Sequence, residues 1–217
     1  MSASTILVLD TEVKPDYRFL GPEIVRHTPG ETEYRAFVPD PEPPALEEYA
    51  GVVLSGSTAS VYDREAHGEW LDPEFDIIQE CIAEEIPLLG VCFGHQAVNA
   101  ALGGEVVGDT RRATFVGMER TGEAPILDGV DTVVPVLHAD VVTELGEGMV
   151  PTARTAYNEF FCSRHADAPV WTVQFHPEFT AAVRDEPSDW NPGEHGFDDT
   201  NSTRVFANFR EQVDGRQ

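Results

Sequence analysis

The chain has 217 residues, of which 39 are acidic and 14 are basic, so its formal net charge at neutral pH is −25. This charge argues against nucleic-acid binding, which needs a positive surface, and against a role at an anionic membrane surface. The acidic residues are spread along the sequence and Lys14 is the single lysine, which predicts a solvated acidic shell of the halophilic type, adapted to high salt.

The three cysteines give a low, odd count that provides no disulfide framework and favours a reducing cytoplasm. Cys81 and Cys162 lie in apolar surroundings and are interpreted as core residues. The sequence shows no apolar run of membrane-spanning length, no signal-peptide pattern and no paired histidine spacing for a metal. We therefore expect one cytoplasmic domain over residues 1–217, with no metal and no cofactor.

Strands and helices are expected to alternate through the first half of the chain. Apolar runs predict strands at residues 5–9, 51–55 and 87–91, and a further strand at residues 23–27. Helical spacing predicts a helix over residues 73–84, with Pro73 at its start, and a second helix over residues 97–102. The proline-rich residues 39–44 are expected to form a loop. This alternation predicts an α/β fold with a doubly wound, mostly parallel sheet of the flavodoxin-like kind.

The second half of the chain has a different pattern. Short β-rich segments predict an antiparallel extension beside the main sheet, at residues 105–107, 113–119, 132–136 and 170–174. Residues 184–199 are rich in Pro, Gly, Asp and Trp and are expected to be a loop. Residues 200–213 predict a closing helix with Val205, Phe206 and Phe209 directed inward.

The segment Gly90-Val91-Cys92-Phe93-Gly94 follows an apolar run and precedes a helix-forming stretch. This is the layout of a nucleophile elbow, in which a sharp turn between strand and helix carries the nucleophile. A thiol at a helix N-terminus feels the positive end of the helix dipole, which favours the thiolate, and nearby free backbone N–H groups can bind an oxyanion. The alternative is that Cys92 is a small core residue, as a lone buried cysteine usually is.

A matching segment, Gln174-Phe175-His176-Pro177-Glu178, follows a predicted strand far downstream. A cysteine nucleophile needs a base to take its proton and an acceptor to orient that base, and His176 and Glu178 supply these groups. A His-x-Glu sequence alone is usually a surface feature. Because both motifs end apolar strands, together they favour a triad of Cys92, His176 and Glu178.

The two motifs together resemble those of class I (triad) glutamine amidotransferases, which hydrolyse the glutamine side-chain amide and pass ammonia to a partner. The resemblance covers most of the chain. Residues 52–60, with Ser55-Gly56-Ser57, resemble the Ser-Gly-Gly-Pro oxyanion loop of that family. Leu137-His138-Ala139-Asp140 resembles the His-Gly-Asp segment of its GMP synthase branch.

The resemblance implies a role for each residue of the site. Backbone N–H groups of Phe93 and of Ser57 would form the oxyanion hole. Glutamine would be held by residues of three segments, namely Gly56, Gln96, Ala139 and Asp140. His95 is expected to be a helix residue that packs locally. Gln96 keeps the alternative of a plain structural role, and so does the pair of His138 and Asp140.

Two departures from the family pattern are present. Gly56-Ser57-Thr58 replaces the usual Gly-Gly-Pro, and a positive φ at Ser57 would place strain there. Residues 184–199 exceed what a minimal amidotransferase needs. They would cover the site, dock a partner or form a solvated insertion, and we favour the insertion.

The leading hypothesis is a glutaminase that supplies ammonia to a separate ATP-dependent synthetase of the GMP synthase type. The chain contains no phosphate-binding Gly-x-x-x-x-Gly-Lys loop and no dinucleotide fingerprint of its own. A second hypothesis is a γ-glutamyl peptidase or hydrolase that acts without a partner through the same triad. A third is a regulatory or scaffold protein without catalysis, against which the three intact residues argue.

Overall fold

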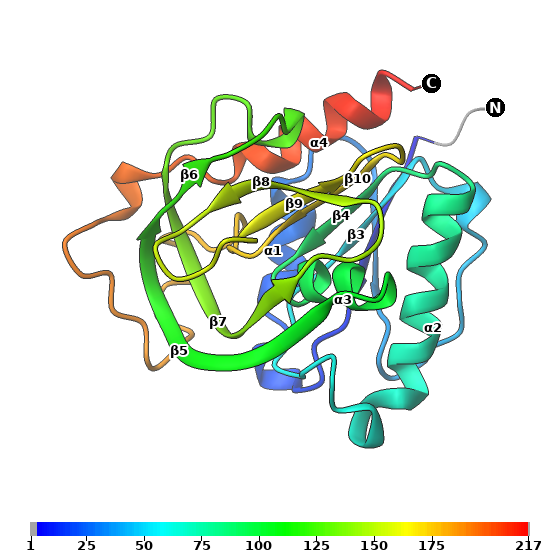
Figure 1. The fold of residues 1–217 in the computed structure, drawn as a ribbon, viewed down its shortest axis with the longest axis horizontal. Helices are drawn as coiled ribbons and strands as arrows, with labels where there is room; N and C mark the ends of the chain where they lie inside the picture. The colour runs from blue at the N-terminus through cyan, green and yellow to red at the C-terminus, as the bar shows by residue number, and fades with distance from the viewer. Residues whose placement is uncertain (1–3, 217) are drawn as a thin grey trace.

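A computed structural model describes residues 4–216, and Figure 1 shows its arrangement of helices and strands. The strands are β1 (Ile6–Asp10), β2 (Thr32–Ala36), β3 (Gly51–Leu54), β4 (Leu88–Val91), β5 (Glu105–Gly117), β6 (Glu119–Arg120), β7 (Val133–Glu144), β8 (Met149–Arg154), β9 (Cys162–His165) and β10 (Val170–Val173). The helices are α1 (Leu20–His27), α2 (Arg64–Ala83), α3 (Phe93–Ala101) and α4 (Arg204–Asp214), with short 3-10 turns η1 (Pro15–Tyr17), η2 (Leu46–Glu48), η3 (Pro125–Leu127) and η4 (Phe197–Asp199).

The central sheet has eight strands in the order β2-β1-β3-β4-β10-β9-β8-β6. The first five run parallel to their neighbours, and the last three are antiparallel. The carboxyl ends of β3, β4 and β10 therefore meet at one edge of the sheet, where the fold is expected to place a site. A separate two-stranded antiparallel sheet, β5-β7, lies beside this edge. The predicted doubly wound α/β fold with an antiparallel extension is confirmed.

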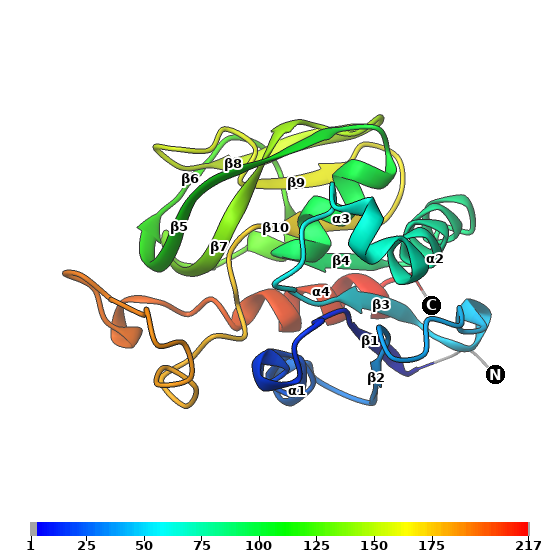
Figure 2. The same ribbon diagram turned by 90° about the horizontal axis from the view of Figure 1, so that it is seen from below.

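Helices cover both faces of the parallel part of the sheet, and Figure 2 shows α1 and α4 on one side and α2 and α3 on the other. Alternate residues of β1 supply the two cores, since Ile6 and Val8 pack toward α1 and α4 while Leu7 and Leu9 pack toward α2 and α3. Cys162 belongs to the first core and Cys81 to the second, and both are fully buried as expected. No helix among residues 4–216 combines the length and apolar character that crossing a bilayer requires.

Two predicted elements are wrong in type or position. Residues 23–27 belong to helix α1, which places Ile24 in the core and sets Glu23 beside His27 one turn later. The second strand comes later, at Thr32–Ala36. Helix α2 starts at Arg64 because the Asp63 side chain accepts a hydrogen bond from the Ala66 N–H at 3.2 Å, so Pro73 lies inside the helix.

The predictions for the second half hold in outline, with one correction. Residues 170–174, expected in the antiparallel extension, form β10, which lies in the central sheet parallel to β4. Strand β5 is longer than the two short segments expected, because bulges let one strand bend along β7. Strands β8 and β9 were not predicted. Helix α4 starts at Arg204, four residues after the predicted start, and buries Val205, Phe206 and Phe209 as predicted.

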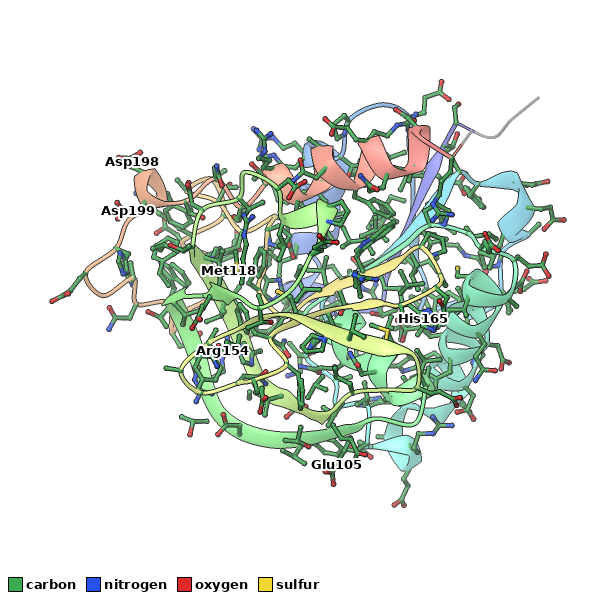
Figure 3. All side chains as sticks on the ribbon, turned by 45° about the horizontal axis from the view of Figure 1, so that its top comes forward. Glu105, Met118, Arg154, His165, Asp198 and Asp199 are labelled. Carbon is green, nitrogen blue, oxygen red and sulfur yellow. The ribbon has the colours of Figure 1, made fainter. Side chains whose placement is uncertain are left out.

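Residues 184–199 form turns and end in the short η4 segment, so the predicted loop is confirmed. The segment projects beyond α4 (Figure 2), and Figure 3 labels Asp198 and Asp199 in its final turn, η4. An aromatic cluster holds the segment to the body of the protein. The Trp190 ring packs against Phe115 at 5.1 Å and against Phe179 at 4.6 Å between centroids.

Glu74 is an acidic residue that the fold buries completely on α2. Neither carboxyl oxygen has a hydrogen-bond partner among the described residues, and burial raises the pKa of Glu74 to about 8. Because this pKa lies above that of the unfolded chain, the folded state binds more protons, and stability is lost as pH rises from about 4.5 to about 8.

We therefore expect Glu74→Leu to raise the free energy of unfolding, by about 2–4 kcal/mol at pH 8 and by less at pH 5. Urea unfolding at both pH values and constant salt would measure the difference. The same substitution at the exposed Glu80 of α2 is the control, for which we expect little change. An equal gain at both pH values would show that the Glu74 carboxyl is not the source of the pH dependence.

Candidate active site

Cys92 lies in the turn between β4 and α3, where the sequence predicts a nucleophile elbow. Its backbone has φ 51° and ψ −100°, a conformation that costs a residue other than glycine about 1–3 kcal/mol. The Cys92 N–H donates to the Val173 carbonyl at 2.8 Å, and its own carbonyl accepts from the Gln96 N–H at 3.2 Å. These bonds tie the turn to β10 and α3 and hold the strained conformation.

Two glycines allow the close packing around this turn. A Cβ atom on Gly94 would lie 2.7 Å from the Leu54 carbonyl oxygen, so a side chain there would push α3 away from β3. A Cβ atom on Gly56 would lie 2.7 Å from Cε1 of His176 and 3.6 Å from Cβ of Cys92. The Cys92 and His176 side chains therefore adjoin the same point, although 84 residues separate them in the sequence.

His176 follows β10 and is almost completely buried, at 2% exposure. Its Nδ1 atom lies 2.7 Å from Oε1 of the fully buried Glu178, which fixes the ring orientation. Burial by itself lowers the pKa of His176, but the negative charges of the Cys92 thiolate and Glu178, with hydrogen bonds to both, outweigh it and raise the pKa to about 10. The imidazolium form is thereby stabilised between two acidic groups.

Two backbone N–H groups from segments that adjoin Cys92 are available as donors. Among residues 4–216, neither the Phe93 N–H at the start of α3 nor the Ser57 N–H has an acceptor. The only residues other than glycine with positive φ in this range are Glu85 and Cys92. Ser57 therefore carries no left-handed strain, and the loop accommodates Ser57 where the family has glycine.

The Gln96 side chain is buried and bridges two segments. Its Nε2 group donates to the Asp140 carbonyl at 3.1 Å and to Oε1 of Gln174 at 3.2 Å. Gln174 in turn points its Nε2 group at the Cys92 sulfur, at 3.6 Å. Gln96 thus lines the cavity and also holds β7 and β10 together at the thiol.

Ala139 and Asp140 lie on β7 and line the same cavity as Cys92 and His176. The Asp140 carboxylate accepts hydrogen bonds from Ser60 at 2.6 Å and from the Tyr62 hydroxyl at 3.1 Å. His138 bonds the Asp140 carbonyl through Nδ1 at 2.9 Å, and burial lowers its pKa to about 4. His138 is therefore neutral and positions this end of β7.

His95 is a buried residue of α3 that packs locally, as expected from the sequence. Its Nδ1 atom lies 2.7 Å from the Thr172 hydroxyl, and burial lowers its pKa to about 3. No cluster of three or more potential metal ligands is found within residues 4–216.

A cavity of about 440 Å³ contains Cys92, His176 and the candidate glutamine-binding residues. Its lining also includes Tyr17, Phe19 and Leu20, which we call the outer wall, and residues 187–189. Arg111 and Asp189 pair through two contacts of 2.9 and 3.3 Å, and the Asn191 N–H donates to the Ala113 carbonyl at 2.9 Å. Residues 187–189 therefore line the cavity, so this part of the segment is not the purely solvated insertion that we favoured from the sequence.

Sequence reasoning assigned no role to several residues that shape the site. Gln174 is part of the motif that contains His176, but the sequence analysis gives it no role. Its signal is that a polar residue stands at the end of a buried strand, two positions before the base. Glu12, Ser60 and Tyr62 contact the site through loops, and no local pattern marks them. Arg111 and Asp189 pair across 78 residues, a contact that only the fold defines.

Comparison with known proteins identifies the family that shares this sequence pattern and fold. Residues 23–187 match the family model described as glutamine amidotransferase class-I. A curated relative is a glutamine-hydrolysing GMP synthase subunit of Methanosarcina mazei, 34% identical over 143 residues, which cover 64% of this chain and 70% of the relative.

Two solved structures share the fold. A protein from Thermoplasma acidophilum, described as a GMP synthase subunit, has a TM-score of 0.75 at 19% identity and covers 100% of this chain and 96% of its own. A glutamine amidotransferase from Thermotoga maritima has a TM-score of 0.72 at 20% identity, covering 98% and 97%. The family match over most of the sequence shows that this chain belongs to the class I glutamine amidotransferases.

Proposed function

We propose that Cys92, His176 and Glu178 form the catalytic triad that hydrolyses L-glutamine in this amidotransferase. The observation that carries the proposal is the convergence of a buried thiol in a strained turn with a buried imidazole whose Nδ1 atom is held 2.7 Å from a carboxylate. Such an arrangement meets the requirements for an activated cysteine nucleophile.

The chemistry follows from these positions. The Cys92 sulfur attacks the carboxamide carbon while His176 holds the thiol proton, which gives a tetrahedral intermediate. His176 then protonates the amide nitrogen, ammonia leaves, and a γ-glutamyl thioester remains. Water, deprotonated by His176, attacks the thioester and releases glutamate and the thiol. Glu178 orients the imidazole and stabilises its charged form throughout.

The remaining residues bind the substrate. The N–H groups of Ser57 and Phe93 donate to the oxygen that becomes negative in each tetrahedral intermediate. Gly56 leaves room for the carboxamide beside His176, and Gln96, Ala139 and Asp140 bind the α-amino and α-carboxylate ends of glutamine. The proposal that these residues bind glutamine is supported by their common position around the cavity.

The ammonia acceptor is assigned to a separate ATP-dependent synthetase of the GMP synthase type. The support is the similarity to the glutamine-hydrolysing GMP synthase subunit of Methanosarcina mazei. We also propose that residues 1–217 form a single amidotransferase domain that works in the cytoplasm without a cofactor.

A glutaminase assay tests this function directly. We expect release of glutamate and ammonia from L-glutamine, and a higher rate when an ATP-dependent synthetase that co-purifies from the native cell is added. Failure to hydrolyse glutamine both alone and with that synthetase would contradict the proposal.

A γ-glutamyl peptidase is the second candidate, and the outer part of the cavity favours it. The volume of about 440 Å³ falls in the range that holds ligands larger than one amino acid, and Tyr17, Phe19 and Leu20 give the outer wall an apolar character. A comparison of kcat/KM for glutamine and for γ-glutamyl dipeptides separates the two. A clear preference for dipeptides, with no effect of a synthetase, would establish the second candidate.

The acidic surface supports adaptation to high salt. Figure 3 shows side-chain oxygen atoms at many points along the outline of the molecule. The net charge of −25 produces repulsion that dissolved ions screen. We expect the midpoint of thermal unfolding to rise as KCl increases from about 0.1 M to about 2 M, where the Debye length falls below about 3 Å. Higher stability at low salt would contradict this adaptation.

A further inference from the structure

Glu12 is a nearly buried carboxylate, at 5% exposure, in the segment that follows β1. It lies outside the triad and is not among the residues expected to bind glutamine. Its two oxygens accept three hydrogen bonds, and two of them come from a single residue, Thr58. The Thr58 N–H donates to Oε2 at 2.8 Å, and the Thr58 hydroxyl donates to Oε1 at 2.6 Å. The third donor is the Lys14 N–H, at 2.8 Å to Oε1.

Thr58 is the residue after Ser57, whose N–H faces the oxyanion in the proposed mechanism. Ser57 and Thr58 stand where the resembling enzymes have Gly-Pro. The loop therefore lacks the fixed φ that proline would give it. Ordering one backbone residue costs about 1–2 kcal/mol, so a loop without proline needs other contacts to hold one conformation. Hydrogen bonds from a backbone N–H and a hydroxyl to a carboxylate are of the stronger kind.

The far end of the same loop is fixed by a second carboxylate. The Ser60 hydroxyl donates to Oδ2 of Asp140 at 2.6 Å, and the Ala59 N–H donates to the Ser57 hydroxyl at 3.1 Å. Glu12 itself is held, since its N–H donates to Oδ1 of Asp10 at 2.9 Å and its carbonyl accepts from Nε of Arg18 at 3.0 Å. Residues 56–60 all line the cavity, and the loop is bound at Thr58 and at Ser60, both of which follow Ser57.

We propose that Glu12 is a positioning residue that sets the conformation of residues 56–60 so that the Ser57 N–H points at the developing oxyanion. Glu12 lines the same cavity as Cys92 and His176, but its carboxylate bonds to neither of them, and its contact with the loop runs through Thr58. The inference rests on the proposed function, because it assigns a cause to the geometry of that oxyanion hole.

The effect of Glu12→Ala on catalysis should appear in kcat rather than in KM. Complete loss of one oxyanion donor lowers kcat by about 10²–10³-fold. A donor that is displaced but still present has a smaller effect, so we expect kcat to fall by about 10–100-fold. KM for glutamine should change less than about threefold, since the residues around the α-amino and α-carboxylate groups stay in place. Glu12→Gln keeps one acceptor oxygen but turns its NH2 group toward the N–H of either Thr58 or Lys14, so it should recover only part of the rate.

Alkylation of Cys92 by iodoacetamide provides the readout that separates positioning from general damage. This reaction displaces iodide at a saturated carbon and forms no oxyanion, so the rate at Cys92, followed by peptide mass spectrometry, should be unchanged in Glu12→Ala. Thr58→Val removes only the hydroxyl and should give a smaller fall in kcat. Glu47→Gln, at an exposed glutamate, is the control and should leave both rates unchanged.

Equal kcat values for wild type, Glu12→Ala and Thr58→Val would overturn the inference. A parallel fall in glutaminase and alkylation rates in both variants would also overturn it, because the turn at Cys92 would then be disturbed. Failure of the proposed function is distinct, since the wild-type protein itself would neither hydrolyse glutamine nor depend on Cys92.

Discussion

Cys92→Ala is expected to lower kcat/KM for glutamine hydrolysis by about 10⁴-fold or more, the loss typical of removing a catalytic nucleophile. No other cysteine can replace it, since Cys81 and Cys162 are buried in the two cores. The free energy of unfolding should change little, because alanine keeps the Cβ atom and therefore the same strain at φ 51°. Steady-state glutaminase assays and urea unfolding of the same preparations would measure both effects.

The control for this prediction is Cys81→Ala, which removes a buried thiol from α2. We expect it to cost about 1 kcal/mol in stability and to leave kcat/KM within about twofold of wild type. Comparable activity losses in the two variants would indicate a structural role for Cys92 rather than nucleophilic catalysis.

Glu178→Gln is expected to lower kcat by about 10³–10⁴-fold while preserving the fold around His176. The amide cannot stabilise the imidazolium as a carboxylate does, and it permits the wrong tautomer at Nδ1, 2.7 Å away. The pKa of His176 should fall, because one of the two negative charges that raise it is removed. If the reactive form holds the proton on His176, the alkaline limb of the pH–rate profile must move to lower pH.

The pH profile distinguishes this role from simple packing. Glu211→Gln, on the outer face of α4, is the matched control and should leave the rate and both limbs of the profile in place. A full-rate Glu178→Gln enzyme, or one with an unchanged alkaline limb, would remove Glu178 from the triad.

Local sequence patterns predict the parts of the fold that local chemistry determines. The buried strands around Cys92 and the closing helix are predictable because apolar runs and helical spacing are local. Residues 23–27 contain β-branched Ile and Val, which favour a strand, yet the burial of Ile24 against the sheet gives a helix. The predicted helix at residues 73–84 is too short because Pro73 favours a helix start, whereas Asp63 caps the helix.

Strand β8 is not predictable from the sequence because Pro151 argues against a central strand. The structure accommodates Pro151 through a register shift in the pairing of β8 with β9. The site is predictable where motifs carry it, at Cys92, His176 and Glu178. It is not predictable where distant segments supply single residues, as with Glu12 on Thr58 or Gln174 on the thiol. Such contacts depend on topology, which no local window contains.

The most direct test of the central claim is mass spectrometry of the wild-type protein treated with a glutamine-analogue electrophile, a chloroketone. We predict addition of one equivalent, located on the peptide that contains Cys92, slowed by excess glutamine and absent in Cys92→Ala. Modification that persists in Cys92→Ala, or that glutamine does not slow, would contradict a nucleophile at this turn.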